Sequence, residues 1–234
     1  MHDPDSLARA LDGVDAVFVN SPSAPDAAEL QIRFLDLAQR AGVSHAVVVS
    51  QCGATLDSLV RFLRWHARVE QHLRTLDLTA TVLRPNLFLQ SLLAVSDALA
   101  QGVLAAPIGT AAVSAVDTRD IAEAAVAALT DPTGRGETHT LTGPRSVTHA
   151  EIARALSEAT GRTIAFHDVT PPQFAAALEG AVPEWQRDGL VEDYAHYARG
   201  EASGVTDAVT RLTGHAARDV TDFARDHATA LIQR

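Results

Sequence analysis

The chain has 234 residues, of which 47% are hydrophobic, and its 29 acidic and 19 basic residues give a formal net charge of −10. This composition predicts a folded protein with a sizeable core, and the lack of any basic run argues against nucleic acid and anionic membranes as partners. No stretch reaches the ~18 apolar residues of a membrane span, and the single cysteine, Cys52, is typical of a cytoplasmic protein without disulfides.

The first half of the chain alternates short apolar runs with helical patterns, which is typical of a parallel α/β sheet. The opening MHDPDSLARALDG predicts a short capped helix, and strands are expected at residues 15–20, 45–50 and 79–83. Helices are expected between the strands, at residues 27–41 and 56–74, because apolar residues recur there with a helical period. The inner face of the second helix is expected to carry Leu59, Leu63 and Leu73.

The pattern of the sequence changes after residue 130. A short strand at 113–116 is expected to lead through Asp117 into a helix at 121–129, and further strands are expected at 137–142 and 162–169. Thr148 and Glu151 form a capping-box pattern that opens a helix ending at Gly161, and short helices follow from Pro171. The sequence therefore predicts two parts, residues 1–135 and a smaller α+β part at 136–234.

No motif for a cofactor or catalytic site is complete in the sequence. All 19 basic residues are arginine, which excludes a lysine Schiff base, a phosphate-loop lysine and a Tyr-x-x-x-Lys pair. No glycine-rich pyrophosphate loop is present, and Gly134-Arg-Gly136 precedes a strand, as a turn does. No metal site is predicted, because the ten histidines are scattered and the cysteine stands alone.

Small polar residues follow three of the expected strands. Ligands of open parallel sheets bind beyond the carboxyl ends of the strands, so these residues are candidates for a binding site. Asparagine, serine and proline also simply end strands, and the residues alone leave both interpretations open. The candidates are Asn20-Ser21-Pro22, Ser50-Gln51-Cys52 and Pro85-Asn86-Leu87-Phe88.

A longer series of motifs resembles one family. Residues 65–88, WHARVEQHLRTLDLTATVLRPNLF, are similar to the helix–strand signature of the NmrA-like atypical short-chain dehydrogenases/reductases. VDTRDIA at 116–122 and LTGP at 141–144 follow in the order of the family, and the resemblance covers nearly the whole chain. It implies a parallel Rossmann-like α/β sheet in residues 1–135, which binds NAD(H) or NADP(H), and a substrate-side subdomain in residues 136–234.

The same resemblance implies that NAD(P)H reduces a flat, apolar small molecule such as a quinone or a dye. A non-catalytic sensor of the nucleotide is the alternative. The implied catalytic residues are Ser50, His66 and Asn86. The nucleotide is expected to contact Asn20, Ser21, Pro22, Ser50, Gln51, His66, Pro85, Asn86, Leu87 and Phe88, and the substrate to contact Phe88, Trp185, Tyr194 and Tyr197.

Two departures from the family pattern bear on activity. The glycine-rich βαβ unit of roughly 50 residues has no counterpart here, which predicts an N-terminally truncated sheet. Its strand 15–20 would be an edge open to self-association, and a remnant that no longer binds nucleotide is a further alternative. The Tyr and Lys of classical relatives align with Phe62, which has no proton to give, and His66. His66 can bond a ribose hydroxyl, or it can pack on the stripe of Leu59, Phe62, Val69 and Leu73.

Overall fold

The computed structural model describes residues 3–232, and the chain folds into two units. Of the described residues, unit 1 comprises 3–85 and 122–140, and unit 2 comprises 86–121 and 141–232. The chain therefore passes between the units after residues 85, 121 and 140, and residues 86–121 belong with the C-terminal part. The functional boundary expected at residue 135 stays a prediction.

A parallel sheet forms the centre of unit 1, as the apolar runs predicted. Its strands are β1 (Ala16–Val19), β2 (His45–Val49), β3 (Thr79–Pro85) and β6 (Thr138–Leu141), in the order β1-β2-β3-β6. β1 pairs in parallel with β2, and β2 pairs in parallel with β3. Every residue of β2 is buried, as expected of an inner strand that is covered on both faces.

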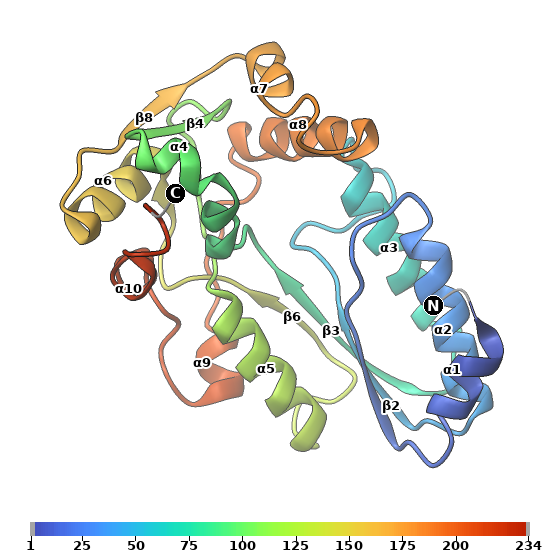
Figure 1. The fold of residues 1–234 in the computed structure, drawn as a ribbon. Coiled ribbons are helices and arrows are strands. Elements are labelled where there is room, and N and C mark those ends of the chain that lie inside the picture. The colour runs from blue at the N-terminus through green and yellow to red at the C-terminus, as the bar shows by residue number, and fades with distance from the viewer. Residues whose placement is uncertain (1–2, 233–234) are drawn as a thin grey trace. The chain divides into compact units, whose positions relative to one another are not determined.

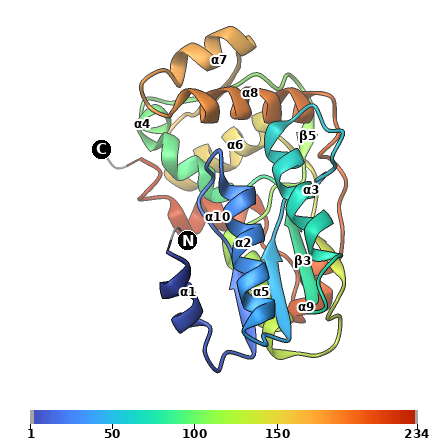
Figure 2. The same cartoon turned by 90° about the vertical axis from the view of Figure 1, so that its right-hand side faces the viewer.

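Helices pack on one face of this sheet. α1 (Pro4–Ala10) begins after Asp3, whose carboxylate accepts the N–H groups of Asp5 and Ser6. α2 (Ala27–Arg40) and α3 (Arg61–Leu73) lie side by side against the strands (Figures 1 and 2). Their apolar stripes share one core with the strands, which includes Leu35, Ala38, Val69, Leu73, Val17, Val19, Ala46, Val48 and Val82.

The helix predicted over residues 56–74 begins five residues later than expected, at Arg61. Local side-chain bonds explain the difference: Thr55 Oγ1 donates to the Asp57 carboxylate over 2.5 Å, and Ser58 Oγ accepts the N–H of Val60 over 3.1 Å. Such bonds offer the backbone an alternative to the helix. Leu59 is therefore 77% exposed, and its predicted place on the inner face is wrong.

Unit 2 is built from short strand pairs and helices. β4 (Val103–Ala106) pairs in parallel with β8 (Ala165–Asp168), and β5 (Ala112–Val113) pairs antiparallel with β7 (Val147–Thr148). The strands expected at 113–116 and 162–169 are thus shorter than predicted, and β4 was missed. The helices of this unit are η1 (Leu89–Val95), α4 (Ser96–Ala100), α6 (His149–Thr160), α7 (Pro171–Ala177), α8 (Glu184–Ala198), α9 (Ala208–Thr213) and α10 (Val220–His227).

Both boundaries of α6 follow the sequence closely. The capping box that opens α6 is confirmed, since Thr148 Oγ1 accepts the N–H of Glu151 and the Glu151 carboxylate accepts the N–H of Thr148. α6 ends at Gly161, whose φ of +68° is in the left-handed region. α5 (Thr118–Thr130) begins three residues before the predicted start at residue 121, since the Asp117 carboxylate accepts the N–H of Arg119 over 2.9 Å, and it runs from unit 2 into unit 1. Within residues 3–232, no helix is both long and apolar enough to cross a membrane.

Candidate functional site

The carboxyl ends of β1, β2 and β3 lie at one edge of the unit 1 sheet, because the three strands are parallel neighbours. The predicted site residues Asn20 and Ser50 directly follow β1 and β2, and Pro85 is the last residue of β3. Asn20 is exposed, whereas Ser50 and Pro85 are buried. Of the other predicted residues in this unit, Pro22 is exposed and Gln51 is half-buried.

A buried amide lies at the end of β1. Gln31, on α2, donates from Nε2 to Oγ of the predicted residue Ser21 over 2.8 Å. The side chain of Gln31 is buried, and its Oε1 has no partner among the described residues. A buried acceptor without a donor is costly, so this edge of the sheet holds an unfilled hydrogen-bonding position.

A hydrogen-bonded group of three side chains joins the ends of β2 and β3 to α3. Ser50 Oγ donates to Glu70 Oε1 over 2.5 Å. Arg84 donates from Nε to Oε1 over 2.8 Å and from Nη2 to Oε2 over 2.5 Å. Ser50 and Glu70 are only 4% and 5% exposed, and the hydrogen bonds to Glu70 raise the pKa of Arg84.

His66 precedes Glu70 by one turn of α3 and is half-buried. Burial lowers the pKa of His66 to about 4, against the opposing negative charge of Glu70. The imidazole is therefore neutral at pH 7, where it can donate one hydrogen bond and accept another. It does not supply the positive charge that the resemblance implies for a lysine at this position in classical relatives. Phe62 is buried and packs on Trp65 with 5.3 Å between ring centroids.

A cavity of about 350 Å³ lies beside this group in unit 1. One face of α3 lines it with residues 67, 70 and 71, and the rest of the lining comes from residues 54–57, Arg74 and Arg84. Cys52 follows β2 at the same end of the strand, and its backbone N–H donates to the carbonyl of Pro85 over 2.9 Å. Burial raises the pKa of the Cys52 thiol, which is therefore protonated at neutral pH.

Asn86 begins unit 2, and its side chain is fully hydrogen-bonded within that unit. Nδ2 donates to Ser114 Oγ and to the carbonyl of Ala202, each over 2.8 Å, and Oδ1 accepts the N–H of Leu87 over 2.8 Å. Leu87 is half-buried, and Phe88 is 41% exposed. Asn86 thus fixes the segment 86–88 to residues 114 and 202, a role that the sequence did not predict.

Three of the four aromatic residues predicted to contact substrate, Trp185, Tyr194 and Tyr197, lie on α8 in unit 2. Tyr194 is the centre of a ring cluster, with centroid distances of 4.8 Å to Phe174, 5.6 Å to Tyr197 and 5.8 Å to His149. Burial raises the pKa of Tyr194 to about 12, so its phenol keeps its proton at neutral pH. Tyr197 is buried in the core of the unit, and Trp185 is half-buried. Their contact with a substrate stays a prediction.

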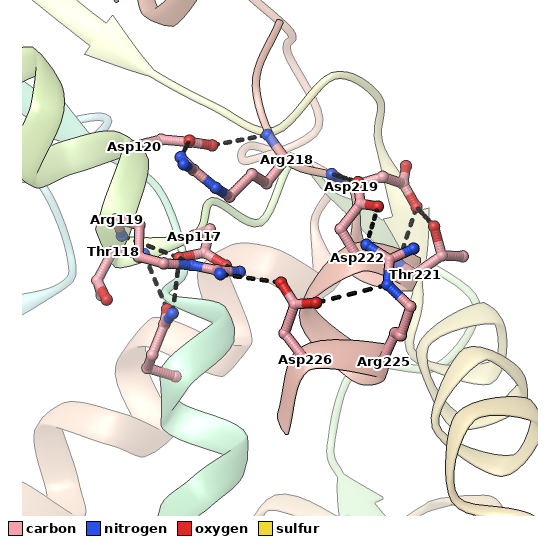
Figure 3. A network of polar contacts seen from close by, with 11 residues as sticks. Asp117, Thr118, Arg119, Asp120, Arg218, Asp219, Thr221, Asp222, Arg225 and Asp226 are labelled. Atoms are coloured by element: carbon pink, nitrogen blue, oxygen red, sulfur yellow. Dashed lines mark hydrogen bonds and ion pairs between the residues drawn. The ribbon is translucent and has the colours of Figure 1, made fainter. Parts of the chain in front are cut away.

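The motif VDTRDIA places two buried aspartates in a partly exposed ionic network in unit 2 (Figure 3). Asp117 accepts Arg119 Nη2 over 2.7 Å, and Arg119 Nη1 also donates to Asp226 on α10 over 2.9 Å. Asp120 accepts the backbone N–H of Arg218 over 2.7 Å and pairs with its guanidinium. This part of the resemblance therefore has a structural role, which is to hold the segment around α10 to the start of α5.

Sequence reasoning missed Glu70 and Arg84, although both lie in the stretch that carries the family resemblance. The signal that could have found them is buried charge. Glu70 follows Val69 on the apolar stripe of α3, and Arg84 is the penultimate residue of β3. Charged side chains are almost never fully buried unless they are paired. A carboxylate on the apolar stripe of α3 therefore predicts a positively charged partner, and a guanidinium inside β3 predicts a negatively charged one.

Comparisons with known proteins find a matching family and similar proteins of known name. The model of the NmrA-like family matches residues 1–223. An NAD(P)H azoreductase of Xenophilus azovorans is 37% identical over 232 residues, which are 98% of this chain and 81% of that protein.

Two solved structures share the fold. The NADPH-dependent quinone oxidoreductase of Escherichia coli, in complex with NADPH, matches 95% of this chain and 79% of its own, with a TM-score of 0.86 at 23% identity. The triphenylmethane reductase of Citrobacter sp., in complex with NADP(H), matches 97% of this chain and 81% of its own, with a TM-score of 0.86 at 24% identity. The Rossmann-like α/β fold predicted from the sequence is confirmed, and the chain belongs to the NmrA-like family.

Proposed function

We propose that this chain uses NADH or NADPH to reduce a flat, apolar small molecule of the quinone or dye kind. The observation that carries the proposal is the 37% identity, over 98% of the chain, to a protein named NAD(P)H azoreductase. The matched quinone oxidoreductase and triphenylmethane reductase bear names of the same reaction class.

The carboxyl edge of the unit 1 sheet fits a nucleotide. Among residues 3–232, Gln31 Oε1 is a buried acceptor without a donor, and hydroxyl or amide groups of a nucleotide would satisfy it. NAD(P)H would supply the hydride there. In unit 1 we assign its binding to Asn20, Ser21, Pro22, Ser50, Gln51, His66 and Pro85.

Reduction of a quinone or an azo bond also needs protons. Phe62, which stands where classical relatives have a tyrosine, has no proton to give. Tyr194 is a poor proton donor, since its pKa is about 12. We therefore assign the protons to solvent. The contribution of unit 2 is to orient the substrate, through the segment held by Asn86 and through Phe88, Trp185, Tyr194 and Tyr197.

The test measures binding first and turnover second. NADH or NADPH at millimolar concentration is expected to raise the melting temperature of the chain and to change the fluorescence of the nucleotide. A quinone or an azo dye is then expected to oxidise the bound nucleotide, which is followed by its absorbance. A chain whose melting temperature and nucleotide fluorescence respond to neither nucleotide contradicts the proposal.

A non-catalytic nucleotide sensor is the second candidate. Two residues of α3 favour it, because they stand where classical relatives have a tyrosine and a lysine. Phe62 has no acidic proton to donate, and His66 carries no charge at pH 7. Binding of NAD(P)H without oxidation by any of a panel of quinones, azo dyes and triphenylmethane dyes would support the sensor and exclude the reductase.

We also propose that copies of the chain associate through β1. β1 stands at the end of the strand order, so within residues 3–232 one of its edges has no strand partner. Phe18 on this strand is 44% exposed, and open strand edges pair readily with other chains. Light scattering is expected to give more than the mass of one chain, and Phe18→Lys is expected to lower it. A monomeric parent chain would overturn this proposal.

We propose a cytoplasmic location and a small-molecule partner rather than nucleic acid. The net charge of −10 and the single cysteine support both. Cell fractionation is expected to place the chain in the cytoplasmic fraction, and mobility-shift assays are expected to show no binding of DNA or RNA at physiological salt.

A further inference from the structure

The hydrogen bond between Ser50 and Glu70 has a fixed direction. An ionised carboxylate accepts hydrogen bonds and has none to donate. The 2.5 Å contact between Ser50 Oγ and Glu70 Oε1 therefore uses the only proton of the Ser50 hydroxyl. What remains of the hydroxyl is its lone pairs, so Ser50 can offer a further partner an acceptor but not a donor.

Arg84 keeps the hydrogen bond between Ser50 and Glu70 in this direction. Its guanidinium holds both oxygens of Glu70, with Nε on Oε1 at 2.8 Å and Nη2 on Oε2 at 2.5 Å. Such bidentate hydrogen bonding fixes the plane of the carboxylate. Glu70 is 5% exposed, and turning it away from Ser50 would leave a buried charge without one of its partners, which is costly.

The position of Ser50 makes its free lone pairs relevant to a ligand. Ser50 directly follows β2, an inner strand of the sheet, and its neighbours in the register end at the same edge. This edge is where ligands of open parallel sheets bind. A group that meets Ser50 there has to bring its own N–H or O–H.

We propose that Glu70 is a positioning residue that fixes Ser50 as a hydrogen-bond acceptor for a donor group of the bound nicotinamide nucleotide. The inference rests on the proposed function. Two parts of such a nucleotide carry suitable donors, the carboxamide N–H and the ribose hydroxyls. Ser50 accordingly does not act as a proton donor to the substrate, and Glu70 and Arg84 act on the ligand only through Ser50.

The test compares the dissociation constants of three probes. NADH or NADPH, whichever binds, is compared with its 3-acetylpyridine analogue, which replaces the carboxamide NH₂ by a methyl group, and with ADP-ribose, which keeps ribose hydroxyls but lacks nicotinamide. If the carboxamide is the donor, the unaltered chain prefers the nicotinamide form over the analogue by about three- to tenfold, the size of one neutral hydrogen bond, and Ser50→Ala removes this preference. If a ribose hydroxyl is the donor, Ser50→Ala weakens all three probes by a similar factor.

A matched control lies at the other end of the same strand. Ser44 directly precedes β2, is exposed and donates to the carbonyl of Asp15 over 3.0 Å. Ser44→Ala is expected to leave all three dissociation constants unchanged. An unchanged set of constants in Ser50→Ala as well would overturn the inference while leaving the proposed function standing. Failure of the unaltered chain to bind any probe would overturn both.

A second measurement tests the fixed direction without any ligand. The Ser50 hydroxyl proton, held in a short bond to a buried carboxylate, is expected to exchange slowly enough to give a proton NMR signal that Ser50→Ala removes. Glu70→Gln places an amide opposite the hydroxyl, so this signal is expected to move or vanish, and the preference among the probes is expected to change with it. If Glu70→Gln fails to fold, the Ser50→Ala comparison still decides the question. A parent chain without the signal would contradict the fixed direction.

Discussion

Arg119 Nη2 donates a hydrogen bond of 2.7 Å to Oδ2 of Asp117, whose side chain is completely buried in unit 2. Burial alone would raise the pKa of Asp117, but the hydrogen bonds from Arg119 hold it below its usual value. The same guanidinium reaches Asp226 on α10 over 2.9 Å. The pair therefore stabilises the contact between the start of α5 and the C-terminal helix while the carboxylate is ionised.

Removing the charge of Asp117 is expected to cost most of the network. Asp117→Asn removes the charge that faces Arg119, which keeps Asp226 as its second partner, and a hydrogen bond to a charged group contributes about 1.5–3 kcal/mol. Urea unfolding at pH 7 measures the loss. The control is Asp207→Asn, which breaks the exposed pair of Asp207 with Arg211, at 2.9 Å. Exposed pairs contribute only about 0.3–0.5 kcal/mol, so equal losses in the two variants would contradict the assignment.

Asn86→Asp is expected to weaken unit 2 by removing both donors of the side chain. A carboxylate cannot donate to Ser114 Oγ, and it would face the carbonyl oxygen of Ala202 at the distance of the present 2.8 Å bond. Ser114 Oγ still donates to the carbonyl of Gly204, and the Ala202 carbonyl still accepts the N–H of Ser114. The cost therefore comes from the new carboxylate, because a buried polar group without its partner costs about 1–3 kcal/mol, and urea unfolding is the measurement.

The chain provides a control in its only other asparagine, Asn20, which is exposed. Asn20→Asp is expected to leave the free energy of unfolding unchanged.

In an NAD(P)H oxidation assay, Asn86→Ala is expected to lower turnover more than His66→Ala does, if the only role of His66 is packing. A larger loss with His66→Ala would instead favour its contact with the nucleotide.

The sheet was predictable from the sequence because its inner strands are continuous apolar runs, such as Ala46–Val49 in β2. β4 was not, since Val-Leu-Ala-Ala has little strand propensity and no alternation, and its partner β8 comes more than 50 residues later. The late start of α3 depends on the short side-chain bonds at Thr55 and Ser58, which hydrophobic periodicity does not reveal.

The candidate site shows the same limit. Ser50 could be chosen from its place after a strand, but its partner Glu70 lies 20 residues further on. The resemblance implies a catalytic role for Asn86, and the sequence gives no sign of its hydrogen bonds to residues 28 and 116 positions away. Spacing arguments find neighbours on one helix or strand, and pairings over such distances are set by the tertiary fold.

Acid is expected to destabilise the chain partly through His149. Burial lowers the pKa of His149 to about 4, below the value of about 6.5 expected when unfolded. Above pH 6.5 neither state holds the proton. Between pH 6.5 and 4 the unfolded state gains a proton that the folded state does not, so stability falls by about 1.4 kcal/mol per pH unit from this residue and levels off below pH 4.

His149→Phe is expected to remove this part of the pH dependence. The ring contacts with Phe166 and Tyr194 can remain, and the buried Nδ1, which has no partner among the described residues, is lost. The free energy of unfolding is measured at pH 7 and at pH 5 for the parent chain and the variant. The control is His167→Phe at an exposed position of β8. The inference fails if His149→Phe keeps the pH dependence of the parent.

Gly143 in the LTGP motif is expected to tolerate no side chain. A Cβ at this position would lie 2.3 Å from the carbonyl oxygen of Ala115, and a backbone atom cannot yield as a flexible side chain does. Gly143→Ala is therefore expected to cost about 1–3 kcal/mol, or a fall of roughly 2–4 °C in melting temperature for each kcal/mol in a chain of this size.

Gly204 is the matched control, because a Cβ there meets no atom within 4 Å and its backbone is not in the left-handed region. Gly204→Ala is expected to leave the melting temperature within about 1–2 °C of the parent, since substitutions away from tight contacts change stability by less than about 0.5 kcal/mol. Equal melting temperatures in the two variants would show that the Ala115 segment can move aside. A selective loss in Gly143→Ala would mean that this glycine of the family motif is required for close backbone packing, whether or not the chain binds a nucleotide.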